Sequence, residues 1–242
     1  MIDKFSSHLS ELKTRIKFSL IVFIGLFIVF YLYAAQLYLM LAHPFLNADN
    51  TKASFIYTHL TEAFITEIKI ALYAALFVAL PIFIIQLYRF IAVGLFRKER
   101  RIALFYIASS IILFYGGVIL VYYYIMPMAW SFFINYQNSF PQELNLALNA
   151  KISEYLDLCL QFMLAFGLAF QLPVLLILLC QLNLIKPVAL AKYRRHAIVF
   201  IFLLAAILTP PDIISQIALA LPLILLYEFS IIIAKRIARD AG

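Results

Sequence analysis

The chain has 242 residues, of which 66% are hydrophobic and 13% are charged, with a formal net charge of +7 and a mean hydropathy of +1.00. A soluble domain of this length would carry about a quarter charged residues, so the composition excludes a soluble fold and indicates a membrane protein. The two cysteines, Cys159 and Cys180, lie in apolar stretches without metal-ligand spacing, and we expect neither a disulfide nor a metal site.

The first predicted element is an amphipathic helix over residues 4–17, lying along the cytoplasmic membrane surface. Apolar residues recur at helical spacing on one of its faces: Phe5, Leu9, Leu12 and Ile16. The segment carries one acid, Glu11, four residues before Arg15, and this spacing predicts a helix-surface ion pair of about 0.3–0.5 kcal/mol. A carboxylate also accepts the planar fork of an arginine, so recognition of a cationic partner is the alternative role of Glu11.

Six apolar runs follow, and each predicts a transmembrane helix of about 20 residues. They lie near residues 18–36, 69–88, 104–126, 155–181, 194–209 and 213–234. The first run is longer than the apolar core of a signal peptide, which has roughly 7–15 residues, so we assign it to a transmembrane helix. The fifth contains an uncharged stretch of only Ala197–Leu208, about 18 Å long against about 30 Å of hydrocarbon. The chain is therefore predicted to form one all-α polytopic membrane domain over residues 1–242.

The distribution of basic residues predicts the orientation of these helices. Sixteen of the nineteen lysines and arginines precede the first run, follow the sixth, lie between the second and third or between the fourth and fifth runs, or begin the fifth run. Three fall on the other side: Lys52, Lys69 and Lys151. Because basic loops remain in the cytoplasm, both termini are expected to be cytoplasmic. The net charge then reflects topology and attraction to lipid headgroups, and we expect no binding to nucleic acid.

A second isolated acid, Glu99, lies in the basic connection FIAVGLFRKERR at residues 90–101. It is expected on the same membrane face as Glu11. Two carboxylates on one face can bind two adjacent arginines of a partner, while the flanking cations repel acidic competitors. The pair of acids therefore favours recognition over a purely structural role.

Four motifs occur in order along the chain: HLSELKTR, FIAVGLFRKER, FGLAFQLP and LLAAILTPPDIISQIALALPLILLYE. Together they resemble the TatC family, and the resemblance covers essentially the whole chain. It implies a glove-shaped bundle of six transmembrane helices in the cytoplasmic membrane of a bacterium, or in an organelle of bacterial origin. It also implies a receptor for twin-arginine signal peptides that exports folded proteins with the proton-motive force. TatA- and TatB-like single-span proteins, further TatC copies and the lipid bilayer are the implied partners.

The resemblance also implies roles for individual residues. Those implied to bind the signal peptide are Glu11, Glu99, Phe90, Lys13 and Arg15. Those implied to line the groove or contact partners are Gln171, Thr209, Asp212, Gln216, Tyr122, Pro44, Glu62 and Phe64. From its position in the long first connection, we expect Pro44 to end a turn at the membrane interface.

Three positions depart from the family pattern. Lys13 stands where arginine is usual, which keeps the charge but loses the planar fork. Val93 replaces a common proline, so the turn after the second span relies on Gly94. Gln171 stands where many members carry glutamate, and an amide can hydrogen-bond but cannot ionise. A role for Gln171 as an interhelical hydrogen-bonding group competes with a role in the signal-peptide groove.

Two other classes of membrane protein, an intramembrane serine protease and a small-solute transporter, predict different sequence features. An intramembrane serine protease needs a nucleophilic serine motif and a histidine within the membrane, and neither is visible in the sequence. A small-solute transporter, the alternative function, predicts internal repeats and several buried ionisable groups, which the chain also lacks. The sequence contains no phosphate loop, metal cluster or nucleotide fingerprint, so we expect no cofactor and no enzymatic activity.

Overall fold

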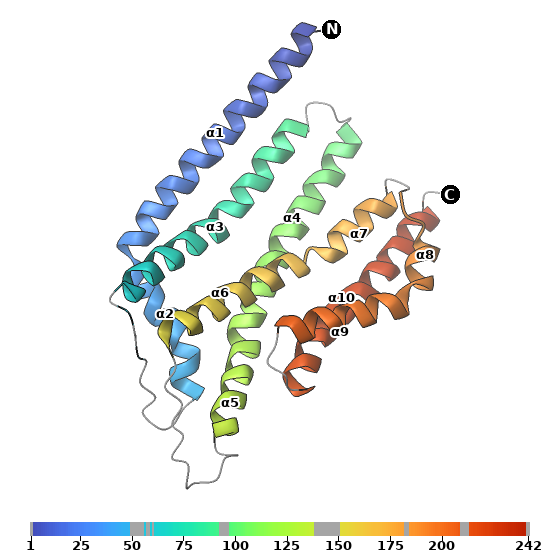
Figure 1. Ribbon diagram of the computed structural model, residues 1–242. Helices are drawn as coiled ribbons and strands as arrows, with labels where there is room; N and C mark the ends of the chain where they lie inside the picture. Colours follow the sequence, from blue (N-terminus) through green and yellow to red (C-terminus); the bar gives the residue numbers. More distant parts are fainter. Residues whose placement is uncertain are drawn as a thin grey trace. The chain divides into compact units, whose positions relative to one another are not determined.

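The computed structural model describes residues 2–48, 56, 59, 61–91, 97–137, 151–181, 184–208 and 213–240. These residues are helical apart from short turns and one isolated bridge between Ile56 and Lys151 (Figure 1). This confirms the predicted all-α class. The elements are α1 (Ile2–Leu32), α2 (Ala34–Ala48), α3 (Glu62–Ile91), α4 (Arg97–Leu120), η2 (Val121–Ile125), α5 (Met126–Gln137), α6 (Ile152–Ala169), α7 (Leu172–Gln181), α8 (Pro187–Lys192), α9 (Arg194–Leu208) and α10 (Ile213–Asp240).

Five helical stretches of the described residues are long and apolar enough to cross a membrane. They are Ser10–Leu32, Glu62–Phe90, Arg100–Ser131, Ile152–Gln181 and Gln216–Ile237. Helix α9 coincides with the fifth predicted span, but its 15 residues extend over only about 22 Å. The short run thus forms a helix, and its inclusion as a sixth span stays a prediction.

Helix α1 joins two segments that we expected to be distinct. It runs without interruption from Ile2 to Leu32, through the predicted amphipathic helix 4–17 and into the first apolar run. The expected boundary near residue 17 is therefore wrong. A change from polar to apolar side chains does not break main-chain hydrogen bonds, and this segment contains no proline. The residues before the span and the span itself form one rod.

Pro44 lies inside helix α2, so the expectation that it ends a turn is also wrong. A proline removes one main-chain donor from a helix and usually breaks it. Here Leu41, Ala42 and Phe45 are buried, and Phe45 packs edge to face against Trp130 with ring centroids 6.1 Å apart. This burial holds the last turn of α2 in place and offsets the lost hydrogen bond.

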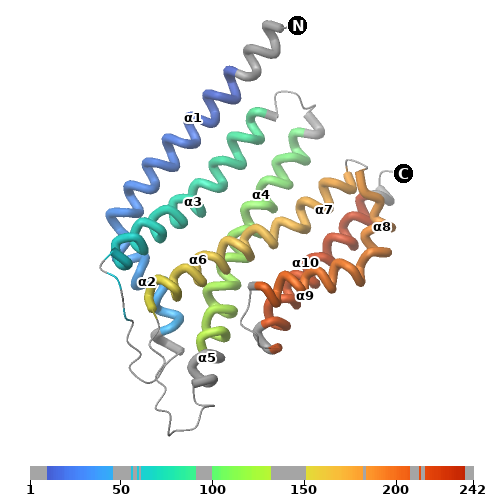
Figure 2. The backbone as a smooth tube through the Cα atoms, viewed as in Figure 1, coloured from blue at the N-terminus to red at the C-terminus, as the bar shows by residue number. Residues whose placement is uncertain are grey.

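The chain divides into two compact units, which we describe separately. Unit 1 consists of residues 1–43, 54–111 and 150–160, and unit 2 of residues 44–53, 112–149 and 161–242. In unit 1, α1 packs along α3 in the antiparallel direction (Figure 2). Helix α3 contains Pro81, which cannot donate a hydrogen bond to the carbonyl of Phe77 one turn earlier. The residues of α3 after Pro81 include those that face α1 near the candidate site.

In unit 2, two glycines allow α4 and α6 to come into close contact. A Cβ atom added to Gly117 would lie 2.8 Å from the carbonyl oxygen of Phe166. A Cβ atom added to Gly167 would lie 2.6 Å from the ring of Phe114. Both phenylalanines are buried. The main chain of α6 at Phe166 and the ring of Phe114 on α4 therefore occupy the space that a larger residue at either glycine would need, as in tightly packed membrane helices.

Unit 2 also contains a turn of π-helix, η2, between α4 and α5. The N–H of Met126 donates to the carbonyl of Val121, five residues earlier, and Pro127 follows immediately. A proline lacks a donor, and a widened turn is one way for a helix to accommodate it. Val121 and Ile125 are buried, whereas the rings of Tyr123 and Tyr124 are exposed. The wide turn thus continues the spanning stretch past a proline while keeping its apolar residues inside.

Helix α10 is the main packing partner of the last helices in unit 2, since α7, α8 and α9 all contact it. The hydroxyl of Tyr227 donates to the carbonyl of Leu190 at 2.9 Å, which fastens α8 to α10. The Nε of Arg194 lies 2.6 Å from a carboxylate oxygen of Glu228, which fastens the start of α9. These polar contacts fix the two short helices against the long one.

The glycine contact gives a first prediction. Gly117→Ala should lower the unfolding temperature of the detergent-solubilised protein, because overpacking typically costs about 1–3 kcal/mol. Gly116→Ala is the matched control, since a Cβ atom there meets nothing within 4 Å. The control should unfold at the wild-type temperature or above. Equal unfolding temperatures for the two variants would contradict the close approach of α4 to Phe166.

Candidate functional site

The ion pair predicted on α1 is present. Arg15 donates from Nε at 3.1 Å and from Nη2 at 2.5 Å, both to Oε1 of Glu11. The two side chains are partly shielded, with 23% of Arg15 and 34% of Glu11 exposed. At this exposure solvent still screens the attraction, so the pair contributes little to stability and can exchange partners.

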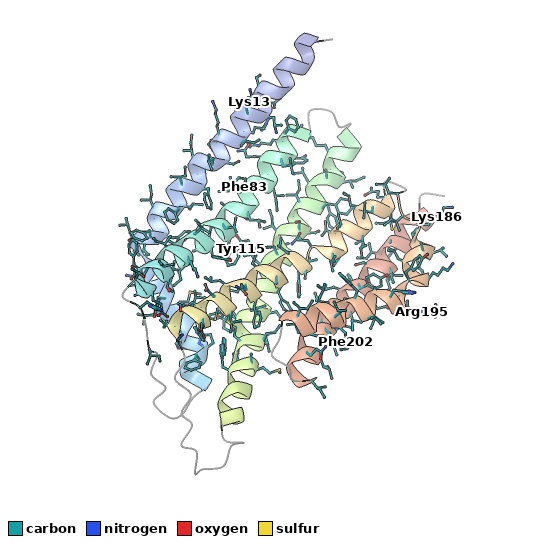
Figure 3. All side chains as sticks on the ribbon, viewed as in Figure 1. Lys13, Phe83, Tyr115, Lys186, Arg195 and Phe202 are labelled. Atoms are coloured by element: carbon teal, nitrogen blue, oxygen red, sulfur yellow. The ribbon has the colours of Figure 1, made fainter. Side chains whose placement is uncertain are left out.

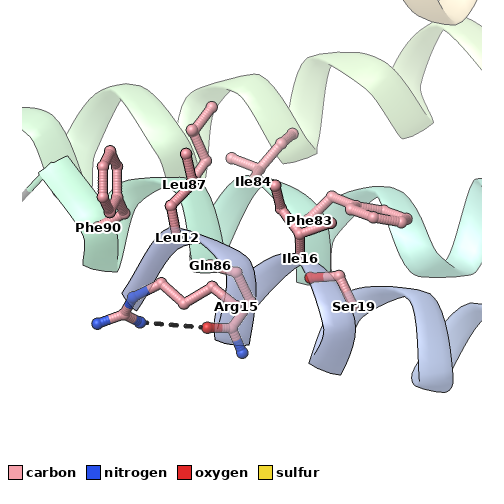
Figure 4. Close-up of a pocket in the computed structure, with 9 residues that line it drawn as sticks. All are labelled: Leu12, Arg15, Ile16, Ser19, Phe83, Ile84, Gln86, Leu87 and Phe90. Atoms are coloured by element: carbon pink, nitrogen blue, oxygen red, sulfur yellow. Dashed lines mark hydrogen bonds between the residues drawn. The ribbon is translucent and has the colours of Figure 1, made fainter. Parts of the chain in front are cut away.

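Arg15 also reaches across to the neighbouring helix. Its Nη1 donates to Oε1 of Gln86 on α3 at 3.3 Å (Figure 4). The guanidinium group therefore bridges α1 and α3 while it holds the Glu11 carboxylate. Gln86 was not among the residues expected at the site. In the sequence, Gln86 is distinguished as the one amide in the apolar segment from Ile82 to Leu87.

Two hollows lie next to one another along α1 and α3, and Arg15 and Gln86 line both. The polar hollow has a volume of about 380 Å³ and is lined by Glu11, Thr14, Arg15, Phe18, Gln86 and Arg89. The apolar hollow has a volume of about 280 Å³ and is lined by Leu12, Arg15, Ile16, Ser19, Phe83, Ile84, Gln86, Leu87 and Phe90 (Figure 4). Together the two hollows suit a peptide that places a cationic side chain beside large apolar ones.

The other residues expected at this site lie around the hollows. Phe90 lines the apolar hollow. Lys13 is exposed on α1 and lines neither hollow (Figure 3). Glu99 belongs to the first turn of α4, and its side chain lies outside the described part of the structure. The residue after it, Arg100, accepts a hydrogen bond at its main-chain carbonyl from the hydroxyl of Tyr88 at 3.2 Å.

A second polar cluster lies where α3 and α6 begin, within unit 1. Glu62 is buried at the first turn of α3 and accepts hydrogen bonds from the hydroxyl of Ser153 at 2.5 Å and from the main-chain N–H of His59 at 3.3 Å. A carboxylate at a helix N-terminus is stabilised by the helix dipole. Lys69 binds both carboxylate oxygens of Asp157, at 2.9 and 2.7 Å. These contacts clamp α3 to the start of α6.

The clamp also affects its surroundings on α2. Burial, followed by the negative charges of Glu62 and Glu67, raises the pKa of the Tyr38 hydroxyl. Phe64 is more than half exposed, although Glu62 two residues earlier is buried. Of the residues expected in the outer connection, Glu62 is thus part of the protein interior and Phe64 is part of its surface.

Gln171 occupies a break in the fourth predicted span. Helix α6 ends at Ala169, α7 begins at Leu172, and Pro173 follows. The main-chain N–H of Gln171 donates to the carbonyl of Leu168, three residues earlier. Its side-chain amide donates to the carbonyl of Gly167 at 3.4 Å, which is the carbonyl that a regular helix would pair with the main-chain N–H. The amide therefore repairs a helix break, a role within one chain segment that we had not considered.

The remaining expected residues make local contacts in unit 2 or lie outside the described structure. Gln216 on α10 donates from Nε2 to the carbonyl of Phe202 on α9 at 3.1 Å. Tyr122 is half-buried in η2, and its ring packs edge-on against Tyr123 with centroids 4.9 Å apart. Thr209 and Asp212 lie outside the described residues.

Comparisons with known proteins agree over nearly the whole chain. A family model described as "Sec-independent protein translocase protein (TatC)" matches residues 7–222. The protein of that name from Rickettsia prowazekii is 44% identical over 96% of this chain and 92% of its own, and that from Magnetococcus marinus is 38% identical over 96% and 84%. A crystal structure of the twin arginine translocase receptor TatC in DDM is 32% identical, with a TM-score of 0.78 over 94% of this chain and 99% of that one.

The helix break gives a second prediction. Gln171→Leu should lower the unfolding temperature, because the Gly167 carbonyl loses the amide that satisfies it within an apolar segment. Gln171→Glu should be tolerated better, since a protonated carboxyl can donate to the same carbonyl. Gln161→Leu on the exposed face of α6 is the control for the loss of an amide and should change little. Wild-type stability of the Gln171→Leu variant would contradict the repair role.

Proposed function

The chain belongs to the TatC family of Sec-independent protein translocase proteins, and we propose on that premise that it is a receptor for twin-arginine signal peptides. In this role it would form the core of a translocase that exports folded proteins, driven by the proton-motive force. The observation that carries the proposal is the pair of hollows on α1 and α3, with the Glu11 carboxylate in one and apolar side chains in the other. The family match does not favour the alternative, a small-solute transporter.

The proposed recognition step is an exchange of arginines at Glu11. In the free protein, Arg15 binds Glu11 from one helical turn away. Such a pair is worth about 0.3–0.5 kcal/mol, whereas a hydrogen bond to a charged group is worth about 1.5–3 kcal/mol before solvent screening. A signal-peptide arginine can therefore displace Arg15 at small cost. Gln86 remains in contact with the displaced guanidinium and keeps it between α1 and α3.

Glu99 is proposed to bind the second arginine of the motif. It lies in the first turn of α4, the helix that follows α3 and its apolar hollow along the chain. Lys13 and Arg89 add positive charge beside Glu11 and would disfavour acidic peptides. The apolar hollow offers room for a large apolar side chain close to the arginines.

The proposed setting is the cytoplasmic membrane of a bacterium or a related organelle membrane, with both termini in the cytoplasm. The sixteen basic residues assigned to one side support this orientation, with α9 as a short sixth span. TatA- and TatB-like single-span proteins and further copies of this chain are the proposed partners. Gln216, Thr209 and Asp212, at the ends of α9 and α10 where they are joined, are proposed to contact these partners.

Signal-peptide binding gives a third prediction. Glu11→Ala and Glu99→Ala should each weaken binding of a fluorescent twin-arginine peptide by roughly tenfold, since each removes one charged acceptor. The measurement is fluorescence anisotropy on the purified protein in nanodiscs. A twin-lysine peptide should bind the wild type more weakly, because lysine lacks the fork that matches a carboxylate.

Glu154→Ala is the matched control for this experiment, because it also removes a carboxylate from unit 1 but lies in the cluster at the start of α6. Its affinity should equal that of the wild type. Unchanged affinity in the Glu11→Ala, Glu99→Ala double variant would contradict peptide binding by these carboxylates. The Glu11–Arg15 pair would then have a purely structural role.

The orientation gives a fourth prediction. A reporter domain that is active only outside the cytoplasm should be active when fused after Gln137 and inactive when fused after Lys98. These two positions lie on opposite sides of the third predicted span. The reverse pattern of activity would place Glu11 and Glu99 on the outer face, where they could not meet a peptide arriving from the cytoplasm.

A further inference from the structure

Tyr88 connects α3, which lines the apolar hollow, to α4, which bears Glu99. Its side chain is 9% exposed, and its hydroxyl donates to the main-chain carbonyl of Arg100 at 3.2 Å. Arg100 lies in the first turn of α4, directly after Glu99. The contact therefore joins α3 to the turn that bears Glu99, twelve residues along the chain.

Tyr88 lies on the side of α3 that faces away from the apolar hollow. Successive helical residues are rotated by about 100°, so Tyr88 points roughly opposite to Gln86 and Phe90, each two residues away. Gln86 and Phe90 line the apolar hollow together with residues of α1. Tyr88 on the other side of the same turn holds α4. One turn of α3 thus contacts both elements that bear a glutamate.

The bond depends on where the main chain of α4 lies, because its acceptor is a carbonyl and not a side chain. A buried tyrosine hydroxyl requires a partner, so the start of α4 is held at one distance from α3. The sequence between the helices, residues 92–96, contains Gly94 and no proline.

We propose that Tyr88 is a positioning residue for signal-peptide recognition, setting the place of Glu99 relative to Glu11 so that the two carboxylates bind two arginines together. This inference rests on the proposed receptor function. Adjacent Cα atoms in a peptide are 3.8 Å apart, so the two carboxylates must keep a matching separation. Paired arginine–carboxylate bonds are directional, and a small displacement of one carboxylate loses part of their energy.

The test is a set of double-variant comparisons with Tyr88→Phe, which removes a single oxygen atom. The variant should bind a twin-arginine peptide about threefold to tenfold more weakly than the wild type, as expected for one lost hydrogen bond. The loss cannot exceed that of Glu99→Ala. In a Glu99→Ala or a Glu11→Ala background, Tyr88→Phe should cause little further loss, because a single remaining carboxylate has no partner whose separation must be kept.

Tyr227→Phe is the matched control. It removes the same kind of bond, from a buried tyrosine hydroxyl to a main-chain carbonyl, but within unit 2. Its peptide affinity should be unchanged. If Tyr88→Phe weakens binding equally with and without Glu99, the residue acts on the hollow or on the fold in general, and the inference is wrong.

A second measurement does not depend on peptide binding. Spin labels at Lys17 on α1 and Arg101 on α4, both exposed, report the separation of the two elements in a background without Cys159 and Cys180. Tyr88→Phe should broaden the distance distribution, and Tyr227→Phe should leave it narrow. An unchanged distribution in Tyr88→Phe would overturn the inference. Failure of the wild type to bind a twin-arginine peptide would instead overturn the proposed function.

Discussion

Within the hydrocarbon core of a membrane no water is available to main-chain carbonyls, so every interruption of a helix must be repaired by the protein itself. Several contacts in this chain follow from that constraint. The side chain of Gln171 donates to the carbonyl of Gly167 where α6 stops. The turn before Pro127 widens, so that Met126 bonds to Val121. Gln216 donates to a main-chain carbonyl of α9. The side chains of Gln171 and Gln216 thus both donate to main-chain carbonyls, and Gln171 does so at a break in the helix.

The candidate recognition site differs in that its polar groups are only partly shielded. Glu11 and Arg15 meet at the edge of an apolar hollow, where solvent weakens their attraction. The clamp at the start of α6 places Glu62 in a more buried environment with a fixed partner, Ser153. The same residue type is therefore held rigidly in one cluster and left exchangeable in the other. An exchangeable carboxylate is what a receptor for a cationic peptide needs.

Much of the fold could be predicted from the sequence because apolar length is a sufficient signal for a spanning helix. The Glu11–Arg15 contact was also predictable, since it depends only on spacing within one helix. Features that depend on tertiary packing could not be predicted. Pro44 continues a helix because its neighbour Phe45 is buried against Trp130. Gln86 and Tyr88 make their contacts with Arg15 on α1 and with Arg100 on α4, and no pattern along α3 itself indicates such partners.

The two walls of the apolar hollow, formed by α1 and α3, differ in whether the helix is interrupted by a proline. Helix α1 is a single rod of 31 residues without a proline, so a displacement at Glu11 is carried to its far end as a tilt of the whole element. On α3, the lining residues from Phe83 to Phe90 all follow Pro81, where one hydrogen bond of the helix is missing. Because helices bend most readily at proline, we expect that segment to move more easily than the part of α3 that is clamped through Glu62 and Lys69. We therefore expect the α3 wall of the hollow to adjust more than the α1 wall when a peptide enters.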